Sequence, residues 1–251
     1  MQILQPTGKI WFNKYTINYF LPFNPDEPHR VITEAKMCMK KVLFFMTMVS
    51  VVFTAYPQKK VIDIDGNAYN VTVIGTQTWM TSNLCVTKYN DGTSIKNVAS
   101  KQEWANLTSG AYCWYNNDAL NKMAFGALYN WYAVETDKLC PNGWHVPSAE
   151  EWEILIKYLD AKKGSAVMLK NRTSWYDENG KENNIGTDDF GFSAVASGWR
   201  NNLGVFIHLF QDCYFWSSKQ DSYYIRSGDI HVMRFYAEKA HGFCVRCIKN
   251  K

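Results

Sequence analysis

The sequence lacks the residue spacings of the common metal, nucleotide and hydrolase sites. Its five histidines are scattered along 251 residues, and none has the H-x3-H or H-E-x-x-H spacing of a zinc site. No P-loop, dinucleotide-binding motif or G-x-S-x-G motif is present. These absences argue against a zinc enzyme, a nucleotide-dependent enzyme and a serine hydrolase. We therefore expect no catalytic residues and no cofactor.

A charge excess of one sign is also missing from the greater part of the chain. The formal net charge is +4, but residues 56–251 carry 21 Lys and Arg against 20 Asp and Glu. No basic cluster interleaved with aromatic residues is found in that part. Because nucleic-acid binding needs a concentrated positive surface, we expect no nucleic-acid partner.

Long hydrophobic runs are absent too. The apolar run at residues 42–55 is interrupted by Thr47, Ser50 and Thr54, and it is shorter than the roughly 20 residues that a spanning helix needs. It directly follows Met39-Lys40-Lys41, and a basic start before a short apolar core is typical of a secretory signal peptide. We predict a signal peptide at residues 39–57, a secreted or cell-surface protein, and no transmembrane anchor after cleavage.

This interpretation leaves residues 1–38 upstream of a segment that is normally N-terminal. We expect a start codon placed too early, with Met37 or Met39 as the true start. A cytoplasmic extension, with the apolar run as a signal anchor, is the alternative. Residues 58–251 then form a single domain.

Cysteines are concentrated after the apolar run. Six of the seven lie there: Cys85, Cys113, Cys140, Cys213, Cys244 and Cys247. An even number in an exported chain favours disulfides, although six cysteines allow 15 pairings and free buried thiols are the alternative. Cys244 and Cys247 form a C-x-x-C on an expected strand, where residues three apart point to opposite faces. A redox pair is therefore disfavoured.

Hydrophobic periodicity predicts strands at both ends of the domain and helices between them. Ser148 and Glu151 form a capping box before an apolar helical face, which predicts a helix over 148–161. A second helix is expected at 125–134 and a helical turn near 101–106, with loop over 162–191. Strands are expected at 61–64, 69–73, 192–195, 205–209, 214–216, 223–226, 231–236 and 243–248. This order favours an α+β domain.

Several ordered segments together resemble one known family. They are IGTQTWM at 74–80, AYCWYNND at 111–118, GALYNWYAV at 126–134, CPNGWHVPSAEEW at 140–152, GFSA at 191–194, SGWR at 197–200, FWSS at 215–218 and GFCVRC at 242–247. The pattern resembles the Fibrobacter succinogenes major paralogous domain, a family of exported bacterial proteins, over about residues 61–249. That family is similar to the C-type-lectin-like fold, including its sulfatase-modifying, formylglycine-generating branch. The resemblance implies two helices against a twisted, mostly antiparallel sheet with long loops, but no particular activity.

The resemblance also implies disulfide pairings. On the lectin-like scaffold, Cys140 before the helix pairs with Cys247 in the last strand. Cys85, Cys213 and Cys244 stand where the family has other residues, and the scaffold then pairs Cys213 with Cys244 and Cys85 with Cys113. An oxidase of the sulfatase-modifying type, using Cys244 or Cys247, is an alternative function.

The candidate ligand-binding residues lie in the loops expected to carry ligands on such a scaffold. They are Trp175, Tyr176, Asn179, Arg200, Asn201 and Asn202. Aromatic faces stack on sugars and amides bond to hydroxyls, whereas the alternative is that Trp175 packs under its loop.

Metal ligation has one weak candidate in these loops. Asp188 and Asp189 could hold calcium, and a solvated turn is the alternative. We expect a non-enzymatic module that binds an extracellular glycan or surface protein through its loops, with a structural surface or filament component as the alternative.

Overall fold

The computed structural model describes residues 11–12, 15–16, 60–162, 164–183 and 185–251. The chain divides into two compact units, residues 1–56 and 57–251. In the first unit, β1 (Trp11–Phe12) pairs antiparallel with β2 (Tyr15–Thr16). The predicted signal peptide at 39–57, and the predicted upstream extension apart from this hairpin, lie outside the described residues and stay predictions.

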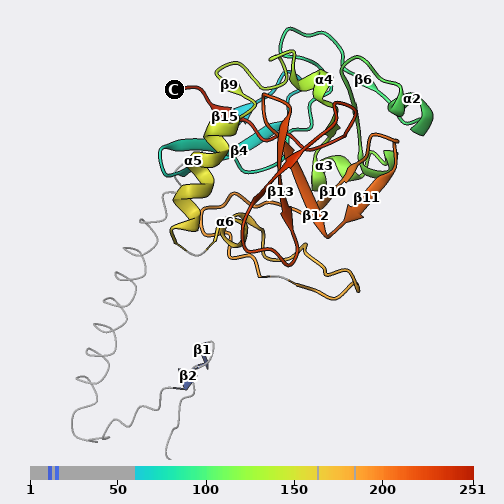
Figure 1. Ribbon diagram of the computed structural model, residues 1–251. Helices are drawn as coiled ribbons and strands as arrows, with labels where there is room; N and C mark the ends of the chain where they lie inside the picture. Colours follow the sequence, from blue (N-terminus) through green and yellow to red (C-terminus); the bar gives the residue numbers. More distant parts are fainter. Residues whose placement is uncertain (1–10, 13–14, 17–59, 163, 184) are drawn as a thin grey trace, which may run out of the picture. The chain divides into compact units, whose positions relative to one another are not determined.

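The second unit is rich in sheet and has few helices, which confirms the α+β class (Figure 1). One sheet has the order β3-β4-β5-β15-β9. Its strands are β3 (Lys60–Ile62), β4 (Ala68–Ile74), β5 (Gln77–Met80), β15 (Ile248–Lys249) and β9 (Trp144–His145), all paired antiparallel. The C-terminal strand β15 therefore lies inside this sheet, between β5 and β9.

A second five-stranded sheet carries the C-terminal third and has the order β11-β10-β12-β13-β14. Its strands are β10 (Ser197–Arg200), β11 (Phe206–Leu209), β12 (Asp212–Trp216), β13 (Asp221–Arg226) and β14 (Met233–Tyr236). Only the β10–β12 pair is parallel. A three-stranded sheet of β6 (Lys96–Asn97), β7 (Ala111–Cys113) and β8 (Leu128–Tyr129) is formed by the segment between β5 and β9.

The helices are short except for one. They are α2 (Lys101–Ala105), the 3-10 turn η1 (Tyr115–Asn117), α3 (Asn121–Phe125), α4 (Trp131–Val134), α5 (Ala149–Asp160) and α6 (Ser165–Leu169). No helix in the described part of the chain is long and apolar enough to cross a membrane.

The predicted capped helix is confirmed in α5. The Ser148 hydroxyl accepts from the Glu151 backbone N–H at 3.2 Å, and the Glu151 carboxylate accepts from the Ser148 N–H at 2.9 Å. On its buried face, the Trp152 ring stacks on Tyr223 at 5.2 Å between centroids and tilts against Trp79 at 5.0 Å. The capping box thus sets the start of a helix whose main anchor is an aromatic cluster joining both large sheets.

Four other expectations about the elements are wrong, and one is the strand at 243–248, where only β15 (Ile248–Lys249) is a strand. Residues 125–134 are not one helix, because Gly126 has a φ of 76° and Leu128–Tyr129 pair with β7 before Asn130 caps the short α4. The predicted loop at 162–191 contains α6. Residues 192–195 form no strand, and β10 follows instead at 197–200. The expected pair of long helices is therefore a single long helix, α5.

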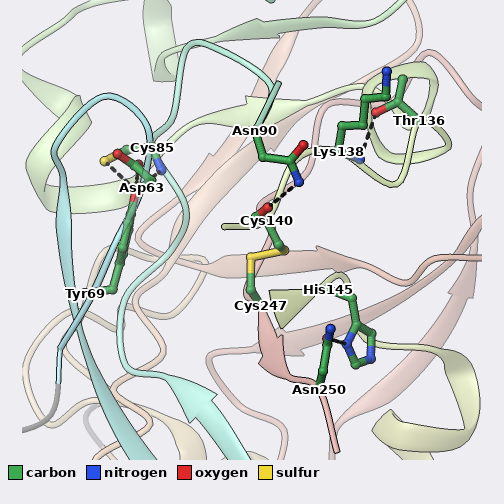
Figure 2. The surroundings of a disulfide bond; sticks show 10 residues. All are labelled: Asp63, Tyr69, Cys85, Asn90, Thr136, Lys138, Cys140, His145, Cys247 and Asn250. Atoms are coloured by element: carbon green, nitrogen blue, oxygen red, sulfur yellow. Dashed lines mark hydrogen bonds between the residues drawn. A yellow bond between two sulfur atoms is a disulfide. The ribbon is translucent and has the colours of Figure 1, made fainter. Parts of the chain in front are cut away.

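The disulfide between Cys140 and Cys247 is present (Figure 2). It closes a sequence separation of 107 residues and ties the segment entering α5 to the residue before β15. The Asn90 side-chain amide donates to the Cys140 carbonyl at 3.0 Å beside it.

The two further predicted disulfides are not formed, because Cys85, Cys113, Cys213 and Cys244 are buried free thiols. Cys85 lies in one hydrophobic cluster, where its sulfur contacts the Tyr69 hydroxyl at 3.3 Å, and Cys113 lies in the other. Cys213 and Cys244 are neighbours, as the pairing required, but both are free thiols, and the Ser197 hydroxyl lies 3.4 Å from one sulfur and 3.2 Å from the other. The pairings Cys85–Cys113 and Cys213–Cys244 are thus corrected.

Candidate functional site

Two aromatic rings, those of Tyr176 and Phe210, border an open depression at the surface of the second unit. The Phe210 ring packs edge-on against Phe125 at 5.8 Å and against Tyr176 at 5.7 Å. The depression measures about 320 Å³ and is lined by Tyr176, Asp177, Gly180, Leu209, Phe210 and Gln211. Phe210 remains 41% exposed.

The turn between β11 and β12 presents Phe210 to solvent. His208 and Phe210 have φ angles of 56° and 65°, a region that bulky L-residues rarely adopt and that costs on the order of 1 kcal/mol each. The Phe210 N–H donates to the Ala196 carbonyl at 2.9 Å, and its carbonyl accepts from the Tyr176 N–H at 2.7 Å. The surrounding backbone therefore holds a strained turn that places the ring outward.

A small hairpin at residues 175–183 carries the second ring. The Asn183 N–H donates to the Trp175 carbonyl at 2.8 Å, and the Asp177 N–H donates to the Lys181 carbonyl at 2.8 Å. Trp175 is fully buried and anchors the hairpin, so that Tyr176, next in sequence, lies half-buried beside Phe210. Side chains of consecutive strand residues alternate between faces, which explains why one ring is inside and the other is at the depression.

Polar groups complete the rim. Asp177 and Gln211 line the depression, and the Asp177 carboxylate also accepts from the backbone N–H groups of Asn179 and Lys181 at 2.9 Å. Next to the turn, the buried Asp212 carboxylate accepts from His208 at 2.7 Å and from Arg226 at 3.1 Å. The depression thus combines apolar faces with hydrogen-bonding groups, the combination typical of small-ligand sites.

Two of the predicted ligand contacts are buried and are corrected. Trp175 cannot offer its face to a ligand because it packs in the core. Arg200 is also fully buried, since its guanidinium donates to the carbonyls of Val98 at 2.6 Å and Ala99 at 2.9 Å. Both side chains support loops instead of binding through them.

The remaining predicted contacts are divided between two places. Asn179 is exposed at the tip of the 175–183 hairpin, beside the depression. Asn201 caps its own turn by accepting from the N–H of Val205 at 2.8 Å, and Asn202 donates to Glu238 at 2.7 Å. Because Arg200 pairs with Phe206 whereas Ser197 pairs with Leu209, the Asn201–Asn202 loop lies at the opposite end of the β10–β11 hairpin from Phe210. Asn201 and Asn202 therefore do not belong to the same site as Asn179.

Of the two calcium candidates, Asp188 and Asp189, the first forms hydrogen bonds within its own loop. Asp188 accepts from the N–H of Ser193 at 2.7 Å and from its hydroxyl at 2.5 Å, so its carboxylate closes a loop. Asp189, the next residue, is exposed. In the described part of the chain no three His, Cys, Asp or Glu side chains are grouped as a metal site.

A buried lysine supports the hairpin from below. The Lys170 ammonium donates to the carbonyls of Ser227 at 2.8 Å and Asp229 at 2.7 Å, and lies 5.2 Å from the centre of the Trp175 ring. Burial lowers the pKa of Lys170 from 10.5 to about 8. The charged form of Lys170 is therefore less stable in the folded protein than in the unfolded chain.

This shift predicts a pH-dependent stability. Between pH 8 and 10.5 the unfolded chain binds more protons at this lysine than the folded one, so the free energy of unfolding rises with pH in that window. We expect the wild type to gain ~3 kcal/mol relative to Lys170→Met from pH 8 to 10.5. Urea unfolding of both proteins across this range measures the difference, and parallel curves would contradict it.

Sequence reasoning missed most of the depression. Phe210, Leu209 and Gln211 belong to a turn whose positive φ angles carry no glycine or asparagine signal. Phe125 is the first residue of the helix expected at 125–134, and nothing in that pattern places its ring beside Phe210. The predicted residues Trp175, Tyr176 and Asn179 belong to this region, and of the three only Tyr176 lines the depression.

The fold defines the class of protein as an α+β domain with one long capped helix. A disulfide joins the segment before that helix to the residue before the last strand. The family model of the Fibrobacter succinogenes major domain matches residues 72–249, and the chain belongs to this family. No curated protein and no solved structure matches the chain.

Proposed function

We propose that this chain is an exported, non-enzymatic binding module that recognises a glycan through the depression beside Tyr176 and Phe210. One observation carries the proposal: a strained turn holds an exposed phenylalanine edge-on beside a half-buried tyrosine, next to Asp177 and Gln211. Sugar rings have apolar faces that stack on aromatic rings, while their hydroxyls need donors and acceptors at the edge.

The proposed export and the proposed fold type are supported mainly by the amino-acid sequence. The signal-like residues 39–57 and the family resemblance support a secreted or cell-surface location, and the sheet-rich architecture with α5 is compatible with a C-type-lectin-like fold. The disulfide between Cys140 and Cys247 suits an oxidising compartment. An oxidase of the sulfatase-modifying type is less favoured, because Cys247 is engaged in that disulfide and Cys244 is fully buried.

The two rings make the proposal testable by substitution. Each stacked ring contributes about 1 kcal/mol, so Tyr176→Ala and Phe210→Ala are each expected to raise the Kd for the bound glycan about fivefold to tenfold. Tyr176→Phe keeps the ring and is expected to bind like the wild type. Isothermal titration with the best sugar of a glycan array gives the values.

The matched control is Tyr236→Ala. Tyr236 is 81% exposed and lies on β14, the edge of its sheet opposite to β11. Glycan binding that is as sensitive to Tyr236→Ala as to Phe210→Ala would place the ligand elsewhere. An array with no bound sugar would favour recognition of a protein or assembly at the surface.

A further inference from the structure

The depression beside Tyr176 and Phe210 contains a carboxylate that no cation of the described chain neutralises. Asp177 lines the depression, and its Oδ1 atom accepts from the backbone N–H groups of Asn179 and Lys181 at 2.9 Å. Both bonds use the same oxygen, and among the described residues no lysine, arginine or histidine side chain forms an ion pair with Asp177. The second oxygen, Oδ2, therefore keeps its capacity to accept from a ligand.

The neighbouring carboxylate of Asp212 shows how this chain treats an acid that has only a structural role. Asp212 follows the lining residue Gln211, and its two oxygens accept from His208 at 2.7 Å and from Arg226 at 3.1 Å. A partly buried carboxylate is normally stabilised by such partners, because loss of water disfavours an isolated charge. Asp177 has backbone partners on one oxygen alone, so a positively charged ligand group would complete its surroundings.

The charge around the depression has the same sign as Asp177. The hairpin at 175–183 carries three acidic residues against one lysine, which are Asp177, Glu178, Glu182 and Lys181. The Tyr176 hydroxyl donates to Glu182 at 3.5 Å, so a second carboxylate lies at the end of that ring. Below the hairpin, Lys170 is 0% exposed and donates to two main-chain carbonyls, so its ammonium is engaged inside the protein. The local field therefore favours a cation over an anion.

The two aromatic rings meet at an angle that also suits a cation. The centroids of Tyr176 and Phe210 are 5.7 Å apart and the ring planes are inclined at 63°, so the rings form a corner and not one flat platform. A sugar that stacks on one ring can point a substituent toward the other. Ammonium groups are attracted to aromatic faces within about 6 Å of the ring centre. The corner and the carboxylate of Asp177 together provide the parts of an ammonium site.

We infer that the depression selects an amino sugar whose nitrogen is a free ammonium group. This inference rests on the proposed glycan function and names the class of sugar. The ammonium donates to Asp177 Oδ2 and to the side-chain oxygen of Gln211, and it lies against the rings of Tyr176 and Phe210. An N-acetyl group has no charge to pair with Asp177, and the carboxylate of a uronic acid is repelled by it.

A pair of oligosaccharides that differ only at nitrogen provides the probe. Isothermal titration of the full chain compares a β-1,4-linked glucosamine oligomer with its fully N-acetylated counterpart of the same length. We expect the wild type to bind the glucosamine oligomer about tenfold more tightly, because a charge-assisted hydrogen bond and a cation–π contact are added. Added salt is expected to reduce this preference by screening the charge of Asp177.

Asp177→Asn assigns the preference to one residue. The asparagine keeps an oxygen that can accept from the Asn179 and Lys181 N–H groups, so the hairpin is retained while the charge is lost. We expect the glucosamine oligomer to bind about tenfold more weakly to this variant, and the acetylated oligomer to bind as to the wild type. Glu178→Gln is the matched control, because Glu178 is exposed on the same hairpin and does not line the depression.

The possible outcomes separate this inference from the proposed function. Equal binding of the two oligomers, with both lost in Phe210→Ala, would overturn the ammonium site and leave the glycan site in place. If Glu178→Gln weakens the glucosamine oligomer as much as Asp177→Asn does, the preference comes from the general charge of the hairpin and the assignment to Asp177 is wrong. A chain that binds neither these oligomers nor any other glycan would overturn the inference together with the proposed function.

Discussion

Replacing Cys140 and Cys247 together by serine is expected to lower the free energy of unfolding by about 4 kcal/mol. The disulfide closes a loop of 107 residues in sequence, and a cross-link of that span removes much of the conformational freedom of the unfolded chain. The loss is large against the total stability of a domain of this size. Urea unfolding of the oxidised wild type and of the double variant measures it.

Reductant provides the matched control for this prediction. Dithiothreitol is expected to bring the wild type down to the stability of the double variant and to leave the variant unchanged, because the other described cysteines are free thiols. A reductant effect on the variant would indicate a further disulfide. A difference between wild type and variant of under ~1 kcal/mol would show that this bridge is not a main source of stability.

Trp152→Ala is expected to have an effect of similar size, with a loss of about 3–5 kcal/mol. The indole is fully buried and contacts Trp79, Phe215 and Tyr223 at centroid distances of 5.0, 5.5 and 5.2 Å. Truncation therefore leaves a large cavity where α5 meets both sheets. Thermal and urea unfolding of the variant give the value.

Trp152→Phe separates ring packing from the indole N–H. The Trp152 Nε1–H has no acceptor in the described part of the chain, and a buried donor without a partner is destabilising. Phenylalanine removes that donor while keeping a ring, so the expected loss is below about 1.5 kcal/mol. If phenylalanine is as destabilising as alanine, the aromatic cluster is not the anchor of α5.

Local signals explain what could be predicted of the fold. Ser148 and Glu151 determine the start of α5 through contacts three residues apart, which a sequence displays directly. Residues 125–134 show helical spacing too, but tertiary contacts override it. The Asn130 side chain accepts from the Ala111 N–H at 2.9 Å, and β8 pairs with β7, neither of which periodicity reveals.

The candidate site was harder to predict because two side chains, Arg200 outside the site and Phe210 within it, have the opposite exposure to that expected of their residue types. Arg200 is an arginine surrounded by backbone carbonyls in the interior, whereas charged residues are normally exposed. Phe210 is a phenylalanine held outward by a strained turn. Its partner Tyr176 comes from a separate hairpin, and only the folded chain brings the two rings together.

The measurement that tests the central claim most directly is a glycan array with the oxidised full chain and its Phe210→Ala variant, each with and without a calcium chelator. The account predicts binding to one class of sugar by the wild type, a strong loss in the variant, and no response to the chelator, since the Asp188 carboxylate is engaged by Ser193. Equal binding by both proteins would contradict the proposed site, and binding that the chelator abolishes would contradict the metal-independent mode.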